Sequence, residues 1–223
     1  IKIDRNDFEV RCRAIADKKP IGICGSGLIY SISEMMDAGI IDRAGQINEK
    51  VPTKRIRNGS EGPEYVLVYA GESGSGHDIA ITQSDIKNIL RAKGAIFAGI
   101  RTMLQEVQLK IDDIERVYIA GGFGNYINIE DAINIGLLPD LPTERFEYVG
   151  NSCIQGTILT MLCRKAYGEA VDIAGKMTYL ELSAGNLFMD EFVSALFIPH
   201  TDLSLFGRNV PMVNEAANMG DFQ

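Results

Sequence analysis

The chain has no concentrated positive charge and no long apolar run. Its formal net charge is -8 and its pI is about 4.9, so the sequence predicts repulsion from a nucleic-acid backbone. No apolar run approaches the roughly 20 residues that cross a bilayer, and no signal peptide opens the chain. These absences exclude nucleic acid and the membrane as expected partners and predict a cytoplasmic protein.

Cysteine is scarce and scattered. The four cysteines form neither a CxxC pair nor the short spacing of a metal-ligand set, so we expect no metal site in this chain and buried reduced thiols instead. They are Cys12, Cys24, Cys153 and Cys163. The glycine-rich segments also lack the Gly-Lys-Ser/Thr of a Walker A loop and the GxGxxG spacing of a dinucleotide fold.

Short β runs alternate with longer helical runs, which is typical of an α/β layer structure. Strands are expected at 64–69, 78–81, 117–120, 146–149 and 177–182, and helices at about 28–36, 83–108, 129–135, 152–168 and 186–196. Gly39 stands where a left-handed helix cap belongs, and Thr82 to Asp85 forms a variant capping box. The second helix should pack across a sheet through a broad apolar stripe.

The first residues and the last differ from this pattern. The chain begins at Ile1 without an initiator methionine, and we expect it to be a fragment of a longer polypeptide. Residues 1–206 should form one lobe, and residues 207–223, which have weak periodicity, a mobile or appended tail.

The most informative feature is the run from Val117 to Asn125, an apolar strand that ends in three glycines within four residues. Without a Cβ, such a turn lets the backbone approach a flat or charged ligand, and ligands settle beyond the carboxyl ends of strands in open α/β sheets. Gly25-Ser26-Gly27 opens a helix, where free N–H groups attract an anion. Gly71 to Gly76 is better interpreted as a hairpin connection. The sequence therefore predicts a nucleotide site.

Five segments together resemble one family. They are Gly22-Ile-Cys-Gly-Ser-Gly-Leu-Ile29, Asp78-Ile-Ala-Ile-Thr-Gln-Ser-Asp-Ile86, Val117 to Asn125, Gly150-Asn-Ser152 and Ala195-Leu-Phe-Ile-Pro-His-Thr-Asp202. The chain from about Pro20 to Phe206 is similar to the C-terminal part of the ATP-dependent reductive activators of corrinoid proteins. These belong to the acetate and sugar kinase, Hsc70 and actin superfamily, whose two lobes clasp ATP. The resemblance implies the second lobe of an actin-like or Hsc70-like ATPase, a mixed sheet flanked by helices.

The resemblance also implies a reaction. Family members use ATP to drive an electron from an N-terminal ferredoxin-like domain with a two-iron two-sulfur cluster onto an inactive cob(II)amide. The product is cob(I)amide in a corrinoid methyl-carrier protein. ATP is needed because that cobalt couple lies below ordinary cellular donors. The chain would therefore have two partners, the missing N-terminal part of its own polypeptide and the methyl carrier, and a homodimer is left open.

Site residues follow from the matched motifs. Gly121, Gly122, Phe123 and Gly124 match the adenosine-binding turn of the superfamily. Lys93, on the long helix, would lie over the base or ribose, and the alternative is a solvated helix residue. Gly25, Ser26 and Gly27 would shape the helix entry beside the nucleotide rather than grip the phosphates. Asn151 and Ser152 either cap a helix or face the cleft.

Two family features are not in the sequence: a cysteine-rich ferredoxin segment and the Asp-x-Gly-Thr-Thr phosphate loop of the first lobe, where most of the Mg²⁺ site for ATP is expected. We therefore expect the chain alone to be inactive. No spacing singles out Glu72, Asp78 or Asp85 as a general base, so the catalytic residues are unknown.

Several alternatives stay open. Cys24 loosely resembles the cluster cysteine of related dehydratase activators, and a dimer could share such a cluster. His77 and His200 are better interpreted as structural histidines. The whole chain could instead be a lobe of a sugar or acid kinase of the same superfamily, or a non-catalytic docking module.

Overall fold

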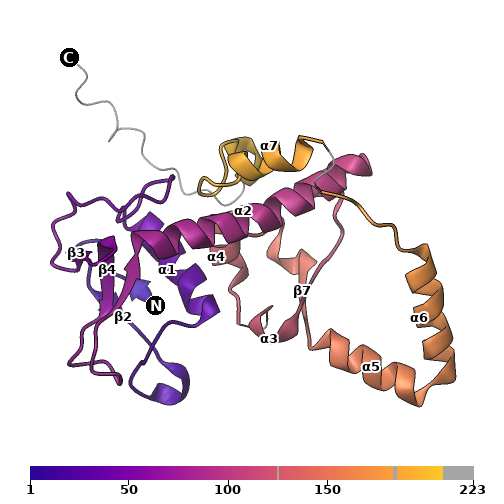
Figure 1. The fold of residues 1–223 in the computed structure, drawn as a ribbon, viewed down its shortest axis with the longest axis horizontal. Coiled ribbons are helices and arrows are strands. Elements are labelled where there is room, and N and C mark those ends of the chain that lie inside the picture. The colour runs from indigo at the N-terminus through magenta and orange to yellow at the C-terminus, as the bar shows by residue number, and fades with distance from the viewer. Residues whose placement is uncertain (125, 183–184, 208–223) are drawn as a thin grey trace.

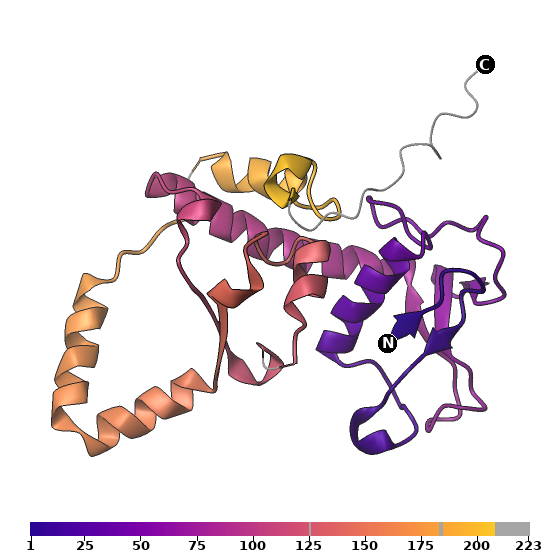
Figure 2. The ribbon, with the colours of Figure 1, turned by 180° about the vertical axis from the view of Figure 1, so that it is seen from behind.

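We describe the protein from a computed structural model, which covers residues 1–124, 126–182 and 185–207. It is a mixed α/β fold in which small sheets are flanked by helices (Figures 1 and 2). The long helix α2 (Gln83–Glu106) runs along the body and joins its two halves: Leu90 belongs to one buried cluster and Phe97 to the other. Of the predicted tail, only Gly207 lies within the described residues.

The first half is built on an antiparallel sheet. Strands β3 (Ile56–Gly59), β4 (Gly62–Val68) and β5 (Ile79–Thr82) pair in the order β3-β4-β5. The glycine-rich segment 71–76 connects β4 to β5, so its interpretation as a hairpin connection is confirmed. A shorter antiparallel pair, β1 (Lys2–Ile3) and β2 (Val10–Arg11), packs beside α1 (Gly25–Asp37).

The predicted helix boundaries in this half are confirmed by their caps. The Thr82 hydroxyl accepts from the Asp85 N–H at 3.1 Å, and the Asp85 carboxylate accepts from the Thr82 N–H at 3.0 Å. This reciprocal arrangement is a capping box, and α2 begins directly after it. Helix α1 ends before Gly39, whose φ of +69° is the left-handed conformation that glycine adopts without strain.

The second half contains a parallel pair of strands, β6 (Val117–Ala120) and β7 (Phe146–Gly150). Between them come the one-turn helix α3 (Gly121–Gly124) and helix α4 (Ile129–Asn134). The Asn128 amide oxygen accepts from the Asp131 N–H at 3.0 Å, which confirms Asn128 as the cap of α4. One face of the pair packs on the second cluster through Phe146, Val117 and Ile119.

Two helices after β7 extend away from the body (Figures 1 and 2). They are α5 (Ser152–Leu162) and α6 (Arg164–Lys176), and we call residues 152–176 the arm. The sequence predicted a single helix here, but the backbone breaks at Cys163, with φ -131° and ψ 110°. The chain then returns to α7 (Leu187–Ser194), which packs on α2.

Two sequence predictions about this region and the thiols are wrong. Residues 177–182 alternate in polarity as a strand does. They pair with no strand in the described part of the chain, however, and so are not a strand. The four cysteines are all exposed rather than buried: Cys153 and Cys163 belong to the arm, and Cys24 caps α1 from outside the core. Separately, none of the helices within residues 1–124, 126–182 and 185–207 has the length and apolar character needed to span a membrane.

Candidate functional site

Two turns lie side by side at the carboxyl end of the parallel β6–β7 pair. They are the glycine turn, Gly121–Gly124, and the turn at Gly150, which leads into Asn151 and Ser152. Ala120 is in register with Gly150, and both strands run in the same direction. Gly121 and Gly122 therefore leave the sheet next to Asn151 and Ser152. Two of the segments predicted from sequence are brought together at the carboxyl ends of the strands, which is where α/β sheets bind ligands.

The glycine turn is packed on one side and open on the other. A Cβ on Gly124 would approach the Ile119 side chain to 2.6 Å, so this glycine is needed for packing. A Cβ on Gly122 would meet nothing within 4 Å, and the same holds for Gly121, whose φ is +91°. Backbone is thus accessible at the first two glycines, as a ligand-binding turn requires. The predicted contact of the Phe123 side chain lies outside what the structure describes.

Asn151 caps α5. Its amide oxygen accepts from the Ile154 N–H at 3.1 Å, so the capping alternative is confirmed for this residue. Ser152 is the first residue of α5 and is exposed. A contact of either side chain with a ligand stays a prediction.

A hollow of about 640 Å³ lies between α1 and the second half of the molecule. Three tyrosines line it from different elements: Tyr30 of α1, Tyr126 after the glycine turn and Tyr148 of β7. The Tyr148 hydroxyl donates to the Ile127 carbonyl, which holds the loop after α3 against the strand. The hollow adjoins the glycine turn but is not lined by it.

The Gly25-Ser26-Gly27 segment forms the first turn of α1. Cys24 is its cap: the Gly27 N–H donates to the Cys24 sulfur at 3.4 Å, and the Ser26 hydroxyl lies 3.3 Å from the same atom. These hydrogen bonds, the one with Ser26 first, lower the pKa of the Cys24 thiol. A Cβ on Gly27 would lie 3.2 Å from the Ile23 side chain. This crowding fits the predicted role in shaping the helix entry, and an anion contact stays a prediction.

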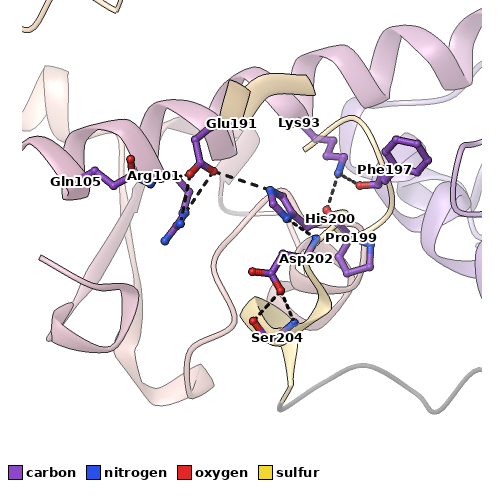
Figure 3. Close-up of polar contacts among 9 residues, drawn as sticks. All are labelled: Lys93, Arg101, Gln105, Glu191, Phe197, Pro199, His200, Asp202 and Ser204. Carbon is purple, nitrogen blue, oxygen red and sulfur yellow. Dashed lines mark hydrogen bonds and ion pairs between the residues drawn. The ribbon is translucent and has the colours of Figure 1, made fainter. Parts of the chain in front are cut away.

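Lys93 is buried, so its interpretation as a solvated helix residue is wrong. Its side chain is 1% exposed, and its ammonium donates to the carbonyls of Phe197 and of Pro199, the latter at 2.7 Å (Figure 3). We call residues 196–202 the strap. Burial lowers the pKa of Lys93 to about 7. Its observed contacts are with the strap, and a contact with adenosine stays a prediction.

A polar network beside Lys93 was not predicted from sequence. Glu191 of α7 accepts from Gln105 at 2.7 Å and pairs with Arg101 at 3.3 Å, so it fixes α7 on α2 (Figure 3). His200 is 3% exposed, its Nδ1 accepts from the Asp202 N–H at 3.0 Å, and its Nε2 lies 3.9 Å from Glu191. Burial lowers the pKa of His200. His200 is thus a buried residue of the strap, but its Nε2 has no hydrogen-bond partner within the described residues, so it is not the fully satisfied structural histidine that was expected.

The remaining titratable candidates have local structural partners or lie at the surface. Asp78 pairs with Arg57 at 2.6 Å and accepts from the Ala70 N–H, and Asp85 belongs to the capping box. His77 was expected to be a structural histidine, but its side chain is exposed. Within the described part of the chain, no group of three or more His, Cys, Asp or Glu side chains could hold a metal ion.

Comparisons with known proteins bear on this arrangement. The sequence model of the C-terminal domain of RACo, the ASKHA domain, matches residues 1–210. The corrinoid activation enzyme RamQ of Eubacterium limosum is 29% identical over 216 residues, which are 94% of this chain and 35% of that protein. The [Co(II) methylated amine-specific corrinoid protein] reductase of Methanosarcina barkeri is 26% identical over 178 residues, 79% of this chain and 29% of that protein.

A solved structure agrees with these matches. The reductive activator for corrinoid, iron-sulfur protein superposes with a TM-score of 0.86 at 55% identity, covering 92% of this chain and 32% of that one. The chain therefore spans about a third of the length of the relatives it matches. Because the family match covers nearly the whole sequence, the chain belongs to the family of the RACo C-terminal domain, an ASKHA domain.

Proposed function

We propose that the chain is the nucleotide-binding second lobe of an ATP-dependent activator that reduces cob(II)amide to cob(I)amide in a corrinoid methyl-carrier protein. The observation that carries the proposal is the open glycine turn at the carboxyl edge of β6 and β7. The names of the relatives support the corrinoid partner. They lend no support to the alternative of a sugar or acid kinase.

The residues at this edge fit an adenine nucleotide. Gly121 and Gly122 leave room for a flat group, and the cap of α5 stands beside them. The first turn of α1, whose Gly27 N–H already donates to Cys24, would shape the helix entry beside the nucleotide rather than grip the phosphates. ATP, when bound, supplies the free energy that favours one protein conformation over another. The chain's own residues would position it and exclude water.

The other components belong to the rest of the polypeptide in this proposal. Mg²⁺ would be held by the triphosphate and by the first lobe. A two-iron two-sulfur cluster would be carried by an N-terminal ferredoxin-like domain and would deliver the electron. The coverage of about a third of each relative leaves room for both parts.

Substitution of Gly122 tests the nucleotide site. The position is open on the protein side, so Gly122→Val should leave the fold intact while its branched side chain fills the space that the nucleotide needs. We expect at least a roughly tenfold loss of ATP affinity, about 1.4 kcal/mol, in the full-length protein by isothermal titration calorimetry.

Gly99→Val is the matched control. Gly99 lies on α2, and a Cβ there also meets nothing within 4 Å. It should bind ATP as the wild type does. Equal ATP affinity in the wild type and the Gly122 variant would refute the assignment of the turn.

A further inference from the structure

The strap, residues 196–202, joins elements that are far apart in the sequence. Arg43, in the loop after α1, donates to the carbonyls of Ile198 and His200, the latter at 2.6 Å, and its own carbonyl accepts from the Ile198 N–H at 2.8 Å. Gly136, which follows α4, lies so close to the strap that a Cβ there would be 2.1 Å from the Pro199 carbonyl oxygen. The buried lysine of α2 donates to the same segment (Figure 3). The position of the strap therefore fixes α2 and α4 relative to the loop after α1.

The hydrogen bond at Nδ1 requires His200 to be neutral. This atom accepts from the Asp202 N–H at 3.0 Å, and because a backbone N–H can only donate, Nδ1 carries no proton and the proton of the neutral ring is on Nε2. The same residue, Asp202, is the cap of the short helix η4 (Leu203–Phe206), since its carboxylate accepts from the Ser204 N–H at 3.0 Å. Both nitrogens of a protonated imidazole are donors. Protonation would therefore set two N–H groups against each other at the start of η4.

The surroundings of the ring also disfavour its charged form. His200 is 3% exposed, and its Nε2 has no hydrogen-bond partner within residues 1–124, 126–182 and 185–207. The Glu191 carboxylate lies 3.9 Å from Nε2 but is already paired with Arg101 at 3.3 Å. Burial, the largest effect, lowers the pKa of His200, and Glu191 opposes it. The charged groups near the residue are Glu191 of α7, Lys93 and Arg101 of α2, Asp202 of the strap and, at the backbone carbonyl of His200, Arg43.

We propose that His200 is a pH-sensitive latch: a proton taken up from solvent at Nδ1 breaks the contact with the Asp202 N–H and opens the strap. In the closed strap the new proton faces a donor, so the ring must turn outward to water. The Asp202 turn and the Arg43 contact lie on either side of the ring and open with it. The proposal is independent of the proposed function, since it involves neither a nucleotide nor a partner protein.

The pH window of the latch follows from the direction of the shift. The open strap exposes an imidazole with an ordinary pKa of about 6.5, whereas the closed strap excludes the proton. The closed form is therefore fully favoured above pH 6.5, and it loses stability as the pH falls below that value. Lys93, with a pKa of about 7, is protonated in both forms in this range and so contributes little to the change. Protection of the strap should fall by up to about eightfold between pH 7 and pH 5.5.

Amide hydrogen–deuterium exchange of the full-length protein at pH 7 and pH 5.5 tests the proposal. The rates of residues 196–206 are divided by the intrinsic amide rates at each pH, so that only opening is compared. In His200→Asn the side-chain amide oxygen is bonded to Cγ as Nδ1 is, so it can accept from the Asp202 N–H, but it is not protonated in this pH range. The strap of this variant should be equally protected at both pH values.

His77→Asn is the matched control, because His77 is exposed, and this variant should keep the pH response of the wild type. Exchange of the imidazole Cε1–H, followed by mass spectrometry, gives the pKa of each histidine in the wild type and needs no variant. It should place the pKa of His200 below 6.5. Equal protection of the wild-type strap at both pH values would overturn the proposal. So would a pKa of 6.5 or above for His200, or the same loss of protection in a folded His200→Asn protein.

Discussion

Lys93 connects α2 to the strap, and its removal should destabilise the fold. In Lys93→Met the apolar stem is retained, but the carbonyls of Phe197 and Pro199 lose their shared donor. An unpaired buried carbonyl costs about 1–3 kcal/mol, and at pH 8, above the Lys93 pKa of about 7, the donor that is lost is mostly the neutral amine. We expect a net loss of about 2–4 kcal/mol in the free energy of unfolding at pH 8. Arg43 still holds the strap through the carbonyls of Ile198 and His200, so the fold should persist.

The pH dependence gives this prediction a second, independent signature. Burial lowers the pKa of Lys93 to about 7 from the ordinary 10.5. Between these values the unfolded chain binds a proton that the folded chain does not, so wild-type stability should rise with pH. The rise is at most about 1.4 kcal/mol per pH unit, because the two states differ by at most one bound proton. The two accepting carbonyls favour the ammonium and so make the rise smaller. Below pH 7 both states are protonated, and this contribution no longer changes with pH.

Urea unfolding at pH 7, 8 and 9, followed by circular dichroism, measures both effects. The stability difference between the wild type and Lys93→Met should grow from pH 7 to pH 9. Lys87→Met, an exposed lysine on the same helix, is the control and should behave as the wild type. A difference that stays constant with pH would refute the desolvation argument, and no destabilisation would refute the role of Lys93 in holding the strap. A loss of ATP affinity in a folded Lys93→Met protein would instead support the predicted adenosine contact.

Two other predictions concern the strap and the reaction. Gly136→Ala should lower the free energy of unfolding by about 3 kcal/mol or more in urea titrations, because φ is +74° and a Cβ would lie 2.1 Å from the Pro199 carbonyl oxygen, whereas Gly99→Ala should be neutral or stabilising. The full-length protein should reduce a cob(II)amide carrier only with both ATP and an electron donor, as followed by visible absorbance. Equal reduction without ATP, or phosphorylation of a sugar, would contradict the proposed function.

Features encoded by neighbouring residues could be predicted from the sequence. The capping box at Thr82 and the positive φ of Gly39 depend on a few consecutive residues, and both are observed. The side-by-side placement of Gly121 and Asn151 depends instead on the parallel pairing of β6 with β7, which was not predicted from the sequence. The break at Cys163 could not be predicted, because Leu162 and Arg164 are both good helix formers and no proline or glycine stands between them.

The burial of Lys93 was not predicted, although the sequence contained a signal for it. Leu90, Lys93 and Phe97 are three and four residues apart and so share one face of α2, and the other two are apolar and buried. A lysine in the middle of an apolar face is a signal for a buried ammonium with acceptors nearby. Its acceptors, however, lie 104 and 106 residues further along the chain. The face could be read from the helical period, but the identity of the strap required the tertiary structure.

The arm shows a second limit of prediction from hydrophobic patterning. The apolar content of α5 correctly predicts a helix, and it also predicts burial, yet residues 152–162 are almost all exposed in this chain. Hydrophobic patterning states that a surface must be covered but carries no information about the covering element. Apolar side chains are also exposed elsewhere, as at Ile15 and Val107, but α5 has the longest run of them along one helix. An exposed apolar helix beside a two-stranded parallel sheet therefore predicts a covering surface without identifying it.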